Sequence, residues 1–419
     1  NMSADPEQEF FCDGIAEDII NDLTRVEGLR VAARTSSFTF KGADLDVRDI
    51  CTKLNVTSVL EGSVRKAGNR LRVTAQLIDG ANGYHVWSER FDRELTDVFA
   101  VQEEIAAAVT RALKVSLSGE QKKKLVRRGT ESVQAYELYL KARETLRQAG
   151  TGRSRAVELF GQAIDVDPEY ALAHAGLAYA HTEIYMFFEN DPAHLEKADT
   201  FSARAIVMDP ELAEAHSARG YYLSQTERYA EAEAEFQRAL ELNPHSYDAC
   251  YQYGRVCIVK KDNIRAADLF RRATEIDPTD YLAASMLHLA YMNMGDSRQK
   301  QALQSSLKAL NEHLTLHPGD VRALQLASTQ FAKHGDAAAA RKCIATMRQL
   351  SPDETGVLYN GACAHAILGD RDEALAFLKQ ALSQGQHLYE WAAMDADFAS
   401  LRDDPEFQKL LTKPLKSGT

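Results

Sequence analysis

The sequence lacks the signatures of the common catalytic and metal-binding sites. It contains no HExxH, GxSxG, GxxxxGKS/T or GxGxxG motif, and its 12 histidines are dispersed. None of its six cysteines belongs to a CxxC pair, so neither a zinc ligand set nor a dense disulfide framework is indicated, and free thiols in a reducing compartment are expected. We therefore expect no catalytic group, no metal and no cofactor in these residues.

Long apolar runs are also missing. No segment is long and apolar enough to span a bilayer, and the first residues do not follow the pattern of a signal peptide. We expect a cytoplasmic location, or a periplasmic one if a membrane anchor precedes Asn1. Because the chain starts without a methionine, we also expect it to be a fragment of a longer protein.

An excess of positive charge is absent as well. The formal net charge is −12, and an acidic surface repels phosphate, so we expect no nucleic-acid partner. The hydrophobic fraction of 45% and the charged fraction of 26% are typical of a soluble globular protein. A chain of 419 residues is too long for one ordinary core, which predicts several domains or a repeat array.

A helical unit occurs twice in succession within residues 213–280. The two copies lie 34 residues apart, which is the tetratricopeptide period. Small residues in this pattern let two helices approach closely, an alanine–phenylalanine stripe faces the next unit, and the proline ends the second helix. The matching residues are Gly220, Ala232, Phe236, Ala239 and Pro244 in the first copy and Gly254, Ala266, Phe270, Ala273 and Pro278 in the second.

The proline position of this unit recurs along the chain. Wider gaps before Pro210 and Pro318 predict insertions between paired helices, near 189–196 and 296–304. We predict seven tetratricopeptide repeats over 135–388 and capping helices over 389–419. Six of the ten prolines share this phase, namely Pro168, Pro210, Pro244, Pro278, Pro318 and Pro352.

A dense basic run at 121–128 lies between the repeats and the amino-terminal part. It could contact an anionic lipid surface or an acidic partner. The simpler interpretation is an exposed linker over 120–134, because basic runs are usually solvated.

Residues 1–119 are predicted to form an α+β domain, a small mixed sheet with helices on one face. Apolar spacing predicts helices at 13–26, 46–54 and 98–117 and a short buried strand at 29–33. Three further strands, joined by tight turns, are expected at 58–65, 70–79 and 84–90, and apolar and polar residues alternate along the middle one.

Three segments of this domain carry a resemblance to a known family. They read NMSADPEQEFFCDGIAEDI, LRVAARTSSFTFKG and VLEGSVRKAGNRLRVTAQLIDGANGYHVWSERFDRE. They resemble the TolB-type, FlgO-like amino-terminal domain, which in bacteria precedes tetratricopeptide repeats, typically downstream of a class III adenylate or guanylate cyclase domain. Fusions to a winged-helix regulator or a protein kinase also occur. The resemblance implies a first apolar strand ahead of Asn1 and cyclase activity in the parent protein, whereas no cyclase catalytic sequence occurs here.

In tetratricopeptide proteins, positions two, five, nine and twelve of each first helix face the concave surface. Tyrosine offers apolar area with a hydroxyl, and arginine can hold a carboxylate, so this surface predicts an extended peptide or partner protein as ligand. The alternative is that the tyrosines pack helix against helix. The predicted groove residues are Tyr139, Arg143, Tyr179, Tyr221, Tyr251, Arg255, Gln325 and Tyr359, with Tyr136, Ser217 and Thr329 at further groove positions.

A polar segment of the amino-terminal domain is the second candidate site. Arg34, Thr35, Ser36 and Ser37 follow the strand predicted at 29–33, and hydroxyls beside an arginine could hold a phosphate. A polar loop that satisfies its own backbone is the simpler interpretation, because no glycine-rich element supports a phosphate cradle.

Two functions from different classes therefore stay open. The first is a non-catalytic interaction region of a bacterial signalling protein, which binds a partner through the repeats. The second is the small-molecule-sensing regulatory half of an adenylate cyclase, with the ligand in residues 1–119 and the cyclase domain upstream in the same chain.

Overall fold

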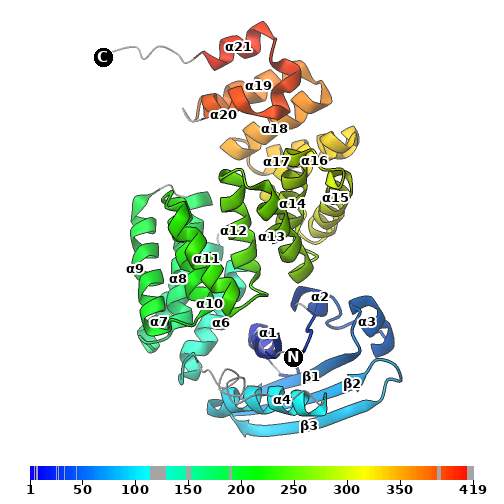
Figure 1. Ribbon diagram of the computed structural model, residues 1–419, viewed down its shortest axis with the longest axis vertical. Helices are drawn as coiled ribbons and strands as arrows, with labels where there is room; N and C mark the ends of the chain where they lie inside the picture. Colours follow the sequence, from blue (N-terminus) through cyan, green and yellow to red (C-terminus); the bar gives the residue numbers. More distant parts are fainter. Residues whose placement is uncertain are drawn as a thin grey trace. The chain divides into compact units, whose positions relative to one another are not determined.

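The computed structural model describes residues 1–3, 5, 8–24, 26, 28–32, 34–43, 45–113, 129–147, 152–187, 191–384 and 388–412. They form two compact units, unit 1 from Asn1 to Pro278 and unit 2 from Thr279 to Thr419 (Figure 1). The basic run at 121–128 lies outside the described residues.

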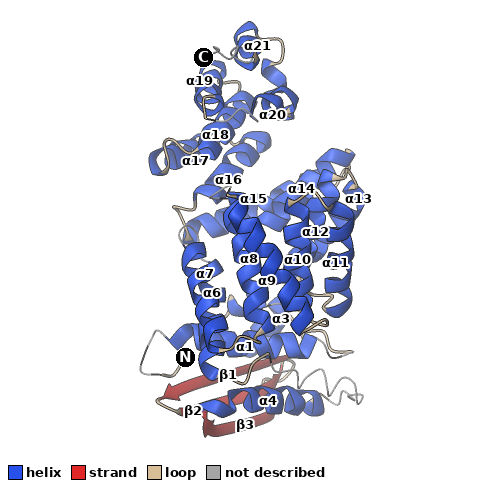
Figure 2. Cartoon of the chain, turned by 90° about the vertical axis from the view of Figure 1, so that its left-hand side faces the viewer, coloured by secondary structure: helices blue, strands red, loops and turns tan. Residues whose placement is uncertain are grey.

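Unit 1 contains a three-stranded antiparallel sheet, with its strands in the order β1 (Ser58–Ala67), β2 (Arg70–Asp79) and β3 (His85–Glu94) (Figure 2). The predicted alternation along β2 is confirmed, since Leu71, Val73, Ala75 and Leu77 are all buried. Helix α4 (Val98–Ala112) packs on β2 and β3, and α1 (Glu9–Thr24) packs on α4. The apolar face of the sheet is therefore covered by helices, which is the α+β arrangement that the sequence predicts.

The strand predicted at 29–33 is wrong. Residues 29–32 have no regular structure, and Ala33 lies outside the described residues. Leu29 and Val31 still pack against the core, so a short apolar run here is a buried connection rather than a strand. The polar segment after it is a short helix, α2 (Arg34–Phe38), and not a loop.

The other predicted helices of this domain have shifted ends. Helix α1 starts at Glu9, ahead of the predicted start at 13, and α3 (Val47–Leu54) matches the prediction, with the Asp46 side chain accepting from the backbone N–H of Arg48. Helix α4 starts at Val98 as predicted and ends at Ala112, while 114–117 lie outside the described residues. Side-chain caps such as Asp46 are what fix a helix start locally.

Seven helix pairs occur in the described residues after α4. Those of unit 1 are α6 (Val133–Arg147) with α7 (Gly152–Val166), α8 (Ala171–Phe187) with α9 (Pro192–Met208), α10 (Ala213–Gln225) with α11 (Tyr229–Leu242), and α12 (Tyr247–Val259) with α13 (Asn263–Ile276). Those of unit 2 are α14 (Tyr281–Met294) with α15 (Gln299–Leu316), α16 (Val321–His334) with α17 (Ala337–Leu350), and α18 (Thr355–Leu368) with α19 (Arg371–Leu382). The pairs are followed by α20 (Leu388–Met394), the 3-10 helix η3 (Ala396–Leu401) and α21 (Pro405–Leu411).

The two predicted insertions mainly lengthen helices. The second helices α9 and α15 have 17 and 18 residues, whereas α11 and α13 have 14 each. Only Gly295–Arg298 separates α14 from α15, so the position predicted for the insertion near 296–304 is wrong. Residues 188–190, where part of the other insertion was expected, lie outside the described residues.

Glycines in the first helices let the paired helices approach closely. A Cβ atom built on Gly254 would lie 2.7 Å from the Phe270 ring, and one built on Gly220 would lie 2.8 Å from the Phe236 ring. Both phenylalanines are fully buried, so neither ring can move aside into solvent. The repeat spacing therefore places glycine where only a hydrogen atom fits.

Replacing Gly254 by alanine is expected to destabilise the protein by about 1–3 kcal/mol, because the new methyl group overpacks against Phe270. Gly161→Ala is the matched control, since Gly161 also lies in a helix but a Cβ there has no neighbour within 4 Å. Helix propensity predicts that this control stabilises by up to about 1 kcal/mol. Urea unfolding followed by circular dichroism measures both, and equal stability of the two variants would contradict the packing argument.

Candidate functional site

An ion-pair cluster joins the sheet domain to the first helix pair within unit 1. The carboxylate of Glu17 on α1 lies 2.9 Å from Arg34 Nε, 3.2 Å from Arg143 Nη2 and 2.7 Å from Arg147 Nη2. Asp18, the next residue, lies 3.5 Å from Arg143 Nη1. Two adjacent acids of α1 therefore face arginines from α2 and α6.

Hydrogen bonds extend this cluster to α4. The Tyr136 hydroxyl donates to Asp18 Oδ2 and accepts from Gln102 Nε2 at 2.9 Å. Burial alone would raise the pKa of Glu17, but the guanidinium groups of Arg143, Arg147 and Arg34 outweigh it and lower that pKa below 4.5. For Asp18 the effect of burial is larger than that of its neighbours, so its pKa is raised although Arg143 and the Tyr136 hydroxyl lower it. The cluster thus holds one carboxylate firmly ionised and a second one less so.

Two arginines that the sequence assigns to ligand binding are used inside this cluster. Arg143, a predicted groove residue, pairs with Glu17 and Asp18. Arg34, the cation of the predicted phosphate loop, pairs with Glu17 and stacks on the Phe38 ring at 4.2 Å. Ser36 and Ser37 are half-buried in α2, while the side chain of Thr35 is outside the described residues. Both arginines therefore form ion pairs within the protein, between α1 and the helices α2 and α6.

Side chains from α8, α10 and α12 meet on what we call the first-helix face of unit 1. The Tyr179 hydroxyl on α8 donates to Asp248 Oδ1 at 3.4 Å and accepts from Gln252 Nε2 at 3.2 Å, both on α12. Arg255 Nη2, also on α12, lies 3.1 Å from the Met186 sulfur on α8. First helices two repeats apart can touch across the one between them only if this face is concave.

The tyrosines of this face differ in exposure. Tyr221 is 0% exposed, and its hydroxyl lies 3.3 Å from Glu183 Oε1. Tyr139 and Tyr251 are each 7% exposed, with Tyr251 packed against the Phe270 ring at 6.0 Å. Tyr179 keeps more of its surface accessible. These three buried rings pack helix against helix, and Tyr179 is the tyrosine of the set that a ligand can reach.

The groove residues predicted in unit 2 also have partners in the chain. Gln325 Nε2 donates to Glu354 Oε1 at 2.9 Å, and Thr329 is buried with its hydroxyl bonded to a backbone carbonyl of its own helix. The Tyr359 hydroxyl donates to Asp395 Oδ2 at 3.1 Å, just ahead of η3. The segment after the last helix pair therefore covers this end of the predicted groove.

The predicted groove residues include no acidic side chain, although acidic side chains lie on the first-helix face. Glu214 and Asp248 occupy position two of α10 and α12, so the positional rule itself would have found them. Glu183 has no such signal; it is buried because Arg153 Nε pairs with its Oε2 at 2.9 Å. Contacts of this kind depend on the tertiary fold.

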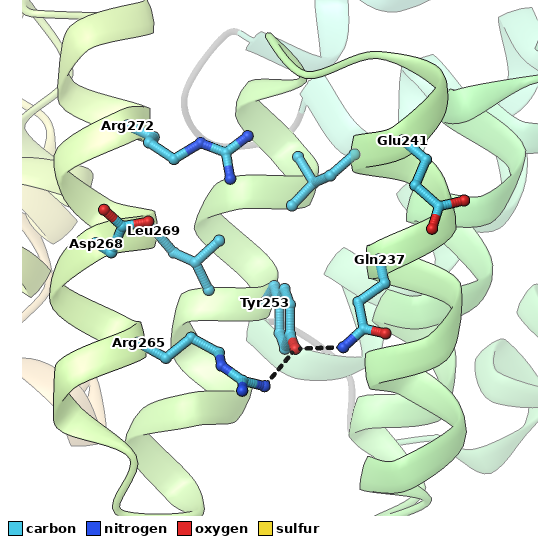
Figure 3. Close-up of a pocket in the computed structure, with 8 residues that line it drawn as sticks. Gln237, Glu241, Tyr253, Arg265, Asp268, Leu269 and Arg272 are labelled. Atoms are coloured by element: carbon cyan, nitrogen blue, oxygen red, sulfur yellow. Dashed lines mark hydrogen bonds between the residues drawn. The ribbon is translucent and has the colours of Figure 1, made fainter.

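A second depression lies on the other side of the same repeats (Figure 3). It has a volume of about 410 Å³ and is open to solvent, between α11 and α13. The Tyr253 hydroxyl at its base accepts from Gln237 Nε2 at 3.0 Å and from Arg265 Nη1 at 2.9 Å, while Arg272 Nη2 donates to the Pro244 carbonyl at 3.0 Å. The charged and polar side chains that line it thus already have partners within the chain.

In the part of the chain that the structure describes, no three histidine, cysteine or acidic side chains gather as a metal site, and no helix is both long and apolar enough to cross a membrane. All six cysteines are buried and free. Burial raises the pKa of Cys250 to about 11 and that of Cys257 to about 12, so both stay protonated and unreactive at neutral pH.

Family models match three parts of the chain. Residues 203–281 and 355–384 match models of the tetratricopeptide repeat. Residues 5–108 match the model of the second domain of HilA/YgeH-like transcriptional regulators. The carboxy-terminal part is thus an all-helical tetratricopeptide array behind a small sheet domain, as predicted. The TolB-type assignment of the sheet domain stays a prediction.

Curated proteins are similar to parts of this chain. A protein of Rhizobium meliloti (strain 1021) named "Putative adenylate cyclase 3" is 41% identical over 236 residues, which cover 56% of this chain and 40% of the relative. Subunit 3 of the anaphase-promoting complex of Schizosaccharomyces pombe is 29% identical over 23% of this chain and 14% of its own length. The chain thus spans less than half the length of these curated relatives.

Solved tetratricopeptide structures are similar at low identity. The crystal structure of YrrB, described as a TPR protein with an unusual peptide-binding site, is 23% identical over 48% of this chain and 97% of its own, with a TM-score of 0.31. A tetratricopeptide protein from Parabacteroides merdae ATCC 43184 is 16% identical over 67% of this chain and 98% of its own, with a TM-score of 0.37.

Replacing Glu17 by glutamine is expected to destabilise unit 1 by about 3 kcal/mol, because it leaves partly buried guanidinium groups without their carboxylate. The pKa of Glu17 is lowered in the folded state, so its contribution is complete above about pH 4.5 and is lost as the pH falls through the lowered value. Stability should therefore fall more steeply on acidification in the wild type than in the variant.

Glu158→Gln is the control for this prediction, because Glu158 forms an exposed pair with Arg155 on α7 and should contribute less than about 1 kcal/mol. Urea unfolding at several pH values measures both variants. Equal losses for the two substitutions would show that the cluster between α1 and α6 is not a stabilising contact.

Proposed function

We propose that this chain is the non-catalytic interaction region of a bacterial signalling protein, and that the first-helix face of unit 1 binds an extended segment of a partner protein. Tetratricopeptide repeats are a protein-binding class, and repeat arrays present an extended concave surface for this purpose. The observation that carries the proposal is the meeting of α8, α10 and α12 side chains around Tyr179, Asp248 and Arg255.

The proposed contacts are divided between exposed and buried side chains. Tyr179, Met186 and Arg255 are partly accessible and offer a partner an aromatic hydroxyl, a flexible thioether and a guanidinium group. Tyr221 and Tyr251 are buried, so their proposed role is to hold these side chains in position. A rigid base beneath a few accessible groups reduces the entropy that binding costs.

The signalling context is also a proposal. It rests on the relative from Rhizobium meliloti, whose name refers to an adenylate cyclase and of which this chain matches 40%. In this proposal a cyclase domain would belong to the parent protein and the matched residues would supply its partner or its input. Small-molecule sensing at Arg34 is less favoured, because this arginine already pairs with Glu17.

Selection of a displayed random-peptide library on the full chain tests the binding function. We expect a family of enriched peptides whose affinity falls at least about tenfold when Tyr179 and Arg255 are both replaced by alanine, since each tenfold corresponds to about 1.4 kcal/mol. Arg272→Ala, in the depression on the other side of the repeats, is the control and should leave affinity unchanged. No enriched peptide, or an equal loss with Arg272→Ala, would refute the proposed face.

A further inference from the structure

Two carboxylates of the first-helix face have no ion-pair partner among the described residues. The buried Oε2 atom of Glu214 on α10 also finds no hydrogen-bond partner there. Asp248 on α12 has an exposed surface and one long hydrogen bond, from the Tyr179 hydroxyl at 3.4 Å. Keeping a carboxylate partly out of water without a cation costs free energy, and a positively charged ligand would lower that cost.

Most cations beside this face are paired with carboxylates of the chain, and Arg255 is the exception. Arg153 pairs with Glu183, and Arg143 and Arg147 pair with Glu17. Arg255 donates to Gln252 Oε1 at 3.0 Å and points its other nitrogen at the sulfur of Met186. The charges left without a partner therefore include two carboxylates, which reverses the expectation that arginines of the groove would hold a carboxylate.

A buried hydroxyl lies on the same side of α10 as Glu214. Ser217 is 3% exposed, and its Oγ atom has no hydrogen-bond partner among the described residues. It follows Glu214 by one helical turn and precedes Tyr221 by another, so the three share one face. Leaving such a hydroxyl unsatisfied costs about 1–3 kcal/mol.

The electrostatics of Asp248 agree with this geometry. Asp248 is exposed at its own surface, but the protein packed around this face takes water away from its carboxyl group and raises its pKa to about 6. Arg147 lowers this pKa, and the negative charges of Glu183 and Glu214 raise it. Carboxylates of three consecutive first helices are thus close enough to repel one another. A cation between them would relieve that repulsion.

We propose that Glu214, Ser217 and Asp248 together receive a lysine or arginine side chain of the bound segment. This inference rests on the proposed function, and it specifies that the bound segment carries a positive charge. The overall charge of −12 also favours a basic segment, because it attracts a cationic partner over a distance. Arg255, two helical turns beyond Asp248 on α12, would then contact a neutral or acidic residue further along the same segment.

Two labelled synthetic peptides of equal length test the charge preference on the full chain, one alternating glycine with lysine and one alternating glycine with glutamate. Fluorescence anisotropy should show the lysine peptide binding at least about tenfold more tightly than the glutamate peptide. The double variant Glu214→Gln, Asp248→Asn should lower affinity for the lysine peptide by about tenfold or more, because it removes both proposed counter-charges.

Asp165→Asn, Glu169→Gln is the matched control. Both residues are exposed, Asp165 in the last turn of α7 and Glu169 in the turn that follows it, and the double substitution removes the same two charges from another surface. If the control variant lowers affinity for the lysine peptide as much as the test variant does, the effect is general charge attraction, and the inference is overturned. Tighter binding of the glutamate peptide, lost on Arg255→Ala, would overturn it while leaving the proposed function intact. If neither peptide binds while peptides selected from the library do, the inference is overturned and the proposed function stands.

Thermal unfolding gives a readout that needs no ligand. If Glu214 and Asp248 lack a cation in the folded protein, the variant Glu214→Gln, Asp248→Asn should unfold at the same temperature as the control variant or a higher one. A midpoint clearly below that of the control would show that the two carboxylates stabilise the fold itself, and the assignment to ligand binding would fail.

Discussion

The carboxylate of Glu17 between three guanidinium groups is the contact on which the arrangement of unit 1 depends. It links α1 of the sheet domain to α2 and to α6, the first helix of the repeat array. Because these ions are largely removed from water, separating the two parts would expose charges that are well paired only in this arrangement. The sheet domain and the first four helix pairs lie in one compact unit.

This contact also changes which charges remain for a partner. Arg143 lies where a groove arginine would hold a ligand carboxylate, but α1 already supplies that carboxylate. Further along the same face, Glu214 and Asp248 keep their negative charge without an ion-pair partner in the described residues. These carboxylates lie beside Tyr179 and Arg255, and the basic segment that we propose as ligand would complement them.

The parts of the fold that repeat or alternate were predicted well. The 34-residue spacing located the helix pairs of residues 213–278, and the alternation along β2 gave its exact bounds, because burial of one face imposes a strict period. The strand at 29–33 was wrong, since a short apolar run is also compatible with a buried connection. The groove residues stay a prediction. The contacts of Arg143 and Arg34 with Glu17 could not be predicted, because the sequence near either arginine does not indicate a carboxylate 126 or 17 positions away.

By itself, the sequence determined the class of the protein and its repeat period, and it predicted which residues face the concave surface. These follow from local rules: glycine permits close helix packing, proline ends a helix, and the position of a residue within a helix sets the face on which its side chain lies. Only the tertiary structure decided which of those side chains stay available. Ion pairs such as Glu17 with Arg143, and contacts such as Tyr179 with Asp248, join residues 126 and 69 positions apart, and no spacing rule connects positions so distant.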